Sequence, residues 1–124
     1  MKNLPANQSK ALYALIREIL VARDGEKCLR CGRQDKLQMS HIYPKGRHRG
    51  MEYYPENIKL LCTGCHLFWW HKHPMEASLW ITTVISKERL DKLKLMANTY
   101  MGKFDWKLHK LYLENELKKY RKNT

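Results

Sequence analysis

The four cysteines of this chain fall into two C-x-x-C pairs, a spacing that turns two sulfur atoms toward one metal ion. The pairs are Cys28 with Cys31 and Cys62 with Cys65. Redox-active pairs share this spacing, but two pairs with no cysteine left over favour a tetrahedral four-thiolate zinc site. Because four thiolates leave no open coordination position, we expect this zinc ion to be structural.

The segment between the two pairs carries side chains suited to hydrolysis. His41 lies near the expected end of a strand, where a neutral imidazole can act as the base that activates water. Asn57 precedes a second expected strand, so its amide can bond the loop backbone and hold the first strand in register. His66 directly follows the last cysteine, and a side chain held there by zinc is suited to binding a second metal ion. Base, orienting amide and metal ligand together predict a hydrolytic site.

The elements that must position these side chains are mainly helical, with one small β-hairpin. Apolar spacing, capping residues and breakers predict them. In chain order they are a helix (7–23), a strand within 36–43, a loop rich in Gly and Pro, a strand (57–62), a helix from about 63 to 73, and helices beginning near Pro74, Ser86 and Asp105. The aromatic run 68–70 is expected in the core, since aromatic residues at helical spacing more often pack inside than stack on bases.

The length of 124 residues favours a single domain. We expect it to divide into an N-terminal helix (1–25), a zinc-bound core (26–73) and a helical extension (74–124). No run of about 18 to 20 apolar residues and no signal-peptide pattern is evident, so a cytoplasmic protein is predicted.

The formal net charge of +12 favours a polyanionic partner, and we expect nucleic acid rather than a merely solubilising surface. The loop after the first strand carries four candidate DNA contacts: Lys45, Arg47, His48 and Arg49. Such groups would contact phosphates and position a duplex without reading its sequence.

The order C-x-x-C, His41, Asn57, C-x-x-C-His66 resembles the HNH nucleases, over roughly residues 26–73. The resemblance implies a ββα-metal core on a pair of zinc knuckles, with one divalent ion beside the scissile phosphate. It implies that His41 is the general base, Asn57 the loop-fixing asparagine and His66 a metal ligand. The expected activity is single-metal hydrolysis of DNA phosphodiesters with Mg²⁺ or Mn²⁺.

The runs "ARDGEKCLRCG" and "NIKLLCTGC", with the lysine-rich helical tail, also resemble the phage NinG (Rap) recombination endonucleases, and the spacing around the knuckles is similar to that of phage endonuclease VII. These resemblances imply a phage-encoded enzyme that acts on branched recombination intermediates, such as Holliday junctions or D-loops, in the host cytoplasm. By analogy, paired cuts would suit a homodimer joined through the C-terminal helices.

Ser40 departs from the pattern, because many HNH enzymes have there an aspartate that serves as the second metal ligand. A hydroxyl binds a hard cation poorly compared with a carboxylate. Three alternatives follow: the ion is held by His66 with phosphate and waters, His71 supplies a second ligand, or the site is inactive.

Two other functions remain open. One is a non-catalytic zinc module that binds DNA as an adaptor, and Ser40 favours it. The other is a sequence-specific or nicking nuclease of the homing or restriction type. The latter needs a base-reading element, and no helix-turn-helix or finger pattern is evident. Branched DNA can be recognised through phosphates and shape alone, which favours the structure-selective nuclease.

Overall fold

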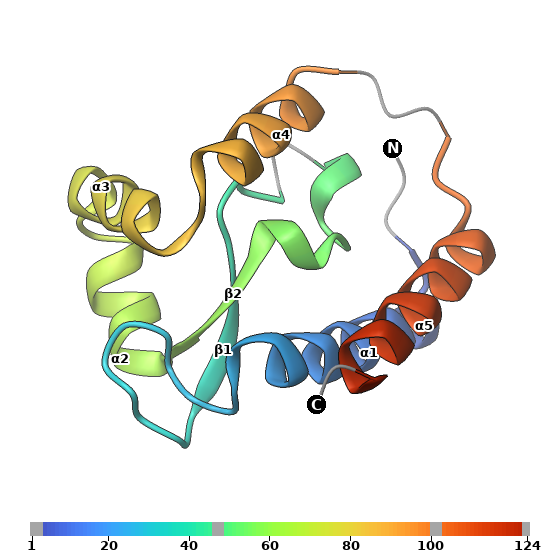
Figure 1. Ribbon diagram of the computed structural model, residues 1–124, viewed down its shortest axis with the longest axis horizontal. Helices are drawn as coiled ribbons and strands as arrows, with labels where there is room; N and C mark the ends of the chain where they lie inside the picture. Colours follow the sequence, from blue (N-terminus) through green and yellow to red (C-terminus); the bar gives the residue numbers. More distant parts are fainter. Residues whose placement is uncertain (1–3, 46–48, 100–102, 123–124) are drawn as a thin grey trace.

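The computed structural model describes residues 4–45, 49–99 and 103–122, and helices make up most of them (Figure 1). The predicted fold class, mainly helical with a small antiparallel hairpin, is confirmed. The elements are, in chain order, α1 (Ala6–Asp24), β1 (Leu37–His41), two short 3-10 turns (Arg49–Met51 and Pro55–Asn57), β2 (Ile58–Cys62), α2 (Thr63–Cys65), a π-helical turn (His66–Trp70), α3 (Pro74–Val84), α4 (Lys87–Ala97) and α5 (Trp106–Lys122).

The main core lies between α1, α5 and the inner strand of the hairpin. α1 and α5 run side by side along one edge of the molecule (Figure 1). Their apolar faces and one face of β2 are buried together, because the helical and strand periodicities each gather apolar residues on one side. The buried members are Leu12, Ile16, Ile19, Leu20, Tyr53, Ile58, Leu60, Leu113 and Leu117.

The hairpin pairs β1 with β2 in a single antiparallel register, in which His41 lies opposite Ile58 and Ser40 opposite Lys59. Every residue of β2 is buried, whereas β1 is the half-exposed outer strand. Since successive strand side chains point to opposite faces, Leu60 packs in the main core and Leu61 packs against the cysteines on the other face.

The end of α1 is tied to the beginning of β2. Gly25 ends the helix with a positive φ of 88°, a backbone conformation that residues with a Cβ rarely adopt. Just before it, Arg23 pairs with Asp24 and donates hydrogen bonds of 2.8 Å to the carbonyl oxygens of Pro55 and Ile58. These bonds fix the loop that precedes β2 against the N-terminal helix.

The later helices begin where the capping residues predict. The Ser86 hydroxyl accepts a hydrogen bond from the Arg89 amide at the start of α4, and the Asp105 carboxylate accepts from two amides in the first turn of α5. None of the described helices combines the length and apolar composition that crossing a membrane requires. The division into three parts and the cytoplasmic location stay predictions.

Candidate functional site

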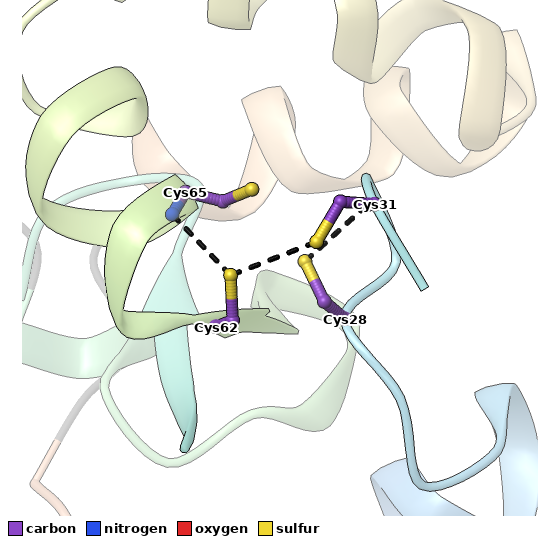
Figure 2. Close-up of side chains that lie close together, drawn as sticks. All are labelled: Cys28, Cys31, Cys62 and Cys65. Atoms are coloured by element: carbon purple, nitrogen blue, oxygen red, sulfur yellow. Dashed lines mark hydrogen bonds between the residues drawn. The ribbon is translucent and has the colours of Figure 1, made fainter. Parts of the chain in front are cut away.

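The four cysteines converge on one point from two separate segments of the chain (Figure 2). All four Sγ atoms lie within 4.8 Å of one another, and Cys31 Sγ is 3.7 Å from Cys62 Sγ. Sulfurs bound tetrahedrally to zinc at about 2.3 Å stand about 3.8 Å apart, so the cluster fits one zinc ion. The cysteines can therefore bind a metal ion, consistent with the predicted structural zinc.

Both C-x-x-C pairs make the same local turn. In each pair the amide of the second cysteine donates to the sulfur of the first, over 3.5 Å for Cys31 to Cys28 and for Cys65 to Cys62. Burial raises the pKa of the Cys28 thiol, but nearby amides oppose this effect and lower the pKa to about 7 overall. Arg30 donates to Cys65 Sγ and lies over the Trp69 ring, so a cation faces the sulfur cluster.

A groove of about 680 Å³ lies beside the outer strand of the hairpin, and it brings three histidines together. Its lining comes from α1, from β1 and the residues after it, from the π-helical turn with His71, and from α3. The residues that line it are Tyr13, Met39, His41, Ile42, Pro44, Lys45, His66, Trp70, His71, Pro74, Ala77, Ser78 and Ile81. This described lining is rich in imidazole and contains no carboxylate.

His41 is half-buried, and one backbone carbonyl orients it. Its Nε2 lies 2.9 Å from the carbonyl oxygen of Glu52. Because a carbonyl oxygen only accepts hydrogen bonds, Nε2 carries the proton and Nδ1 keeps its lone pair. Burial lowers the pKa of His41 below its usual value, and the positive charge of Lys45 lowers it further. The ring is therefore neutral at pH 7 and has the protonation state that a general base requires.

Asn57 is fully buried, and its amide bonds two segments of the loop between the strands. Its Oδ1 accepts a 2.8 Å hydrogen bond from the Tyr43 amide, and its Nδ2 donates to the carbonyls of Tyr43 and Met51. The segment just after β1 and the segment just before Glu52 are thereby held by one amide. Asn57 can therefore fix the loop that carries Glu52, whose carbonyl oxygen bonds His41.

His66 and His71 face each other because the helix is wound as a π-turn between them. The His71 amide bonds the carbonyl of His66, five residues back, over 3.2 Å. The two Nε2 atoms lie 3.0 Å apart and are hydrogen-bonded to each other in this structure. Nitrogen ligands that bind one ion at about 2.1 Å and at right angles are about 3 Å apart, so this pair fits a shared divalent cation. This spacing is compatible with the alternative in which His71 supplies a second ligand, and the choice among the three alternatives stays a prediction.

Ser40, where many HNH enzymes have a metal-binding aspartate, lies away from the groove. Its side chain is fully buried, and within the described part of the chain its hydroxyl has no hydrogen-bond partner. Across the hairpin lies the buried Lys59, whose Nζ is 3.9 Å from the Asp24 carboxylate. In this structure Ser40 is therefore not placed to bind an ion in the groove.

The candidate DNA contacts are only partly within the described chain. Lys45 lines the groove. Arg47 and His48 lie outside the described residues, as does the side chain of Arg49.

The expectation that 68–70 is core is wrong: none of the three side chains is fully buried, and Phe68 is 63% exposed. The wider π-turn changes which side chains face inward. As a result, Trp70 packs beside the cysteine cluster and Phe68 faces outward.

Three residues that shape the site, Gln38, Tyr13 and Glu52, are not predicted from the sequence. The Gln38 side chain lies 2.6 Å from Nδ1 of His66, and the Tyr13 hydroxyl bonds the carboxylate of Glu52 over 2.7 Å. Each contact joins elements far apart in the sequence. The alternation of β1 could have placed Gln38 on one face, but nothing local pairs it with His66.

A comparison with protein families finds a match over the part of the chain that carries the cysteines, the hairpin and His66. Residues 28–67 match the HNH endonuclease family model. This HNH segment runs from Cys28 to the residue after His66, so it contains both strands of the hairpin and Asn57. No curated protein and no solved structure matches the chain. The HNH segment supports a nuclease that binds DNA, and the narrower resemblance to the NinG proteins and endonuclease VII stays a prediction.

Proposed function

We propose that this protein is a metal-dependent DNA endonuclease that acts on branched or recombination-intermediate DNA. One observation carries the proposal: within the HNH segment, His41 and His66 line the same groove, with His41 neutral and its tautomer fixed by a carbonyl. A base and a metal ligand on one groove are the two groups that hydrolysis of a phosphodiester needs.

His41 is the proposed general base. With Nε2–H bound to the Glu52 carbonyl, its Nδ1 lone pair is available to take a proton from the attacking water. Asn57 acts as the positioning residue, because it ties down the loop that presents this carbonyl. Lys45, at the groove and close enough to affect His41, is placed to contact a phosphate.

His66 and His71 would hold the catalytic divalent ion. A bound divalent ion would stabilise charge on the phosphate oxygens and on the leaving oxygen. The four cysteines, of which Cys65 directly precedes the π-turn, would keep the start of that turn in place through the structural zinc. Arg47, His48 and Arg49 are retained as proposed DNA contacts.

The preference for branched DNA rests on recognition through charge and shape. The net charge of +12 suits phosphate contacts, and α4 and α5 carry many of the basic residues. A homodimer is proposed because a junction needs paired cuts, and α5 exposes Leu108 and Leu111 as candidate contacts. The oligomeric state is measured by light scattering.

The test compares a four-way junction, a flapped duplex and a linear duplex of matched sequence, each with Mn²⁺ and with Mg²⁺. Faster cutting of the branched substrates is expected. Equal cutting of all three would refute structure selectivity, and cutting confined to one sequence would support the homing or restriction type. Binding without cutting of any substrate would support the adaptor, which is favoured by the absence of carboxylates from the described groove lining.

A further inference from the structure

The imidazole of His66 is hydrogen-bonded to Gln38, a residue that does not line the groove. Gln38 lies on β1, paired across the hairpin with Leu61, and its Oε1 is 2.6 Å from Nδ1 of His66. An amide oxygen only accepts hydrogen bonds, so Nδ1 carries the proton of the neutral ring. The lone pair is then on Nε2, the atom that lies 3.0 Å from Nε2 of His71.

The second imidazole reaches this position through the backbone. In an α-helix, residues five apart lie well away from each other around the axis, since one turn takes 3.6 residues. The π-turn adds a residue to the turn and brings the two rings to a centroid separation of 4.5 Å. Two imidazole nitrogens that can serve as metal ligands therefore lie next to each other in the groove lining.

The donor set of this site differs from that of a magnesium site. Mg²⁺ prefers oxygen ligands and keeps several waters, and its protein sites are usually built on carboxylates. The described groove lining contains no carboxylate, and Ser40 lies buried away from it. Imidazole nitrogens suit first-row transition ions, with affinity rising from Mn²⁺ through Co²⁺ to Ni²⁺.

We infer that Gln38 is a positioning residue that locks His66 with Nε2 toward His71, so that the two imidazoles bind a transition-metal ion in preference to Mg²⁺. This inference rests on the proposed function, since it concerns the same site. It also goes beyond the expected choice of Mg²⁺ or Mn²⁺, because it excludes magnesium as the preferred ion. The lock works as ligand-orienting hydrogen bonds do in other metal sites, by fixing the tautomer and the ring angle.

The experiment measures metal binding in the absence of DNA. The zinc-loaded full chain is titrated by calorimetry with Mg²⁺, Mn²⁺, Co²⁺ and Ni²⁺, and its zinc content is measured after each titration to exclude exchange at the cysteines. We expect affinity to rise in that order. Mg²⁺ binding as tightly as Mn²⁺ would overturn the choice of ion.

Two variants of Gln38 test the lock. Gln38→Met keeps the length of the side chain but removes the acceptor, and it should weaken Mn²⁺ and Ni²⁺ binding about 10- to 100-fold. Gln38→Glu keeps an acceptor oxygen and should retain affinity within about threefold of wild type. Equal losses in both variants, or no loss in Gln38→Met, would refute the role of Gln38.

The outcome separates this inference from the proposed function. Tight transition-metal binding that depends on Gln38, in a protein that cuts no DNA, would leave the inference intact and refute the nuclease. A Gln38→Met variant that cuts DNA and keeps wild-type metal affinity would refute the role of Gln38 and support the nuclease. Thermal melting of each variant checks that the hairpin is folded.

Discussion

The Tyr13 hydroxyl donates a 2.7 Å hydrogen bond to the carboxylate of Glu52, the residue whose carbonyl oxygen orients His41. Tyr13 belongs to α1, so the N-terminal helix takes part in positioning the candidate base although it lies outside the HNH segment. The Tyr13 and His41 rings also meet edge to face, with centroids 6.3 Å apart. The helices around the hairpin therefore do more than bury its apolar face.

Tyr13→Phe removes this hydrogen bond and keeps the ring. Because the acceptor is charged, we expect a loss of about 1–2 kcal/mol in the free energy of unfolding. We also expect cleavage to slow by roughly 10-fold, since the Glu52 carbonyl is held less firmly. Tyr120→Phe, on α5 and away from the groove, is the matched control and should cut at the wild-type rate. Equal rates for both variants would refute the positioning role.

Asn57→Ala removes the amide that bonds Tyr43 and Met51. Three backbone groups lose their partner at a fully buried position, so the free energy of unfolding should fall by about 3–4 kcal/mol. Asn98, whose amide donates to the Lys94 carbonyl on the exposed end of α4, provides the control, and Asn98→Ala should cost less than about 1 kcal/mol. Urea unfolding of the two variants measures both values, and similar midpoints would contradict the role given to Asn57.

Ser40→Ala tests whether the serine that replaces the usual aspartate contributes to stability, cleavage or metal binding. The hydroxyl is buried and unpaired within the described chain, so its removal should leave the free energy of unfolding within about 1 kcal/mol of wild type, or raise it. Cleavage and metal affinity should not change. A loss of cleavage greater than about 10-fold, with the protein still folded, would make Ser40 a working part of the site.

The cleavage rate should depend on pH through His41, which acts only when neutral. Burial places its pKa below the usual value of about 6.5, so the rate should rise with pH in acid, with a midpoint below that value. Lys45→Ala removes a positive charge that lowers this pKa, so the rise should move to higher pH, whereas Lys87→Ala on α4 should not move it. Single-turnover rates at saturating substrate test this, and a midpoint above pH 7 in the wild type would contradict it.

Most of the fold follows from local patterns in the sequence. The apolar periodicity of 7–23 predicts α1, and Ser86 and Asp105 mark the starts of α4 and α5. The cysteine spacing predicts the cluster because a short C-x-x-C turn is itself a local structure.

The parts of the site that could not be predicted depend on tertiary contacts. Gln38 meets His66, and Tyr13 meets Glu52, only after the hairpin has packed against its helices. The π-turn that pairs His66 with His71 leaves no mark in apolar spacing, and it also turns Phe68 outward. The burial of Ser40 depends on which face of β1 is covered.

The measurement that tests the account most directly is cleavage of branched DNA by wild type and by His41→Ala, with Mn²⁺ present. Both proteins should contain one zinc ion per chain and melt at similar temperatures, because His41 contacts the loop through a single hydrogen bond. We expect the wild type to cut and the variant to be slower by at least about 100-fold, the usual contribution of a general base. A variant that cuts as fast as wild type would contradict the role of His41, and a wild type that binds but never cuts would contradict the nuclease.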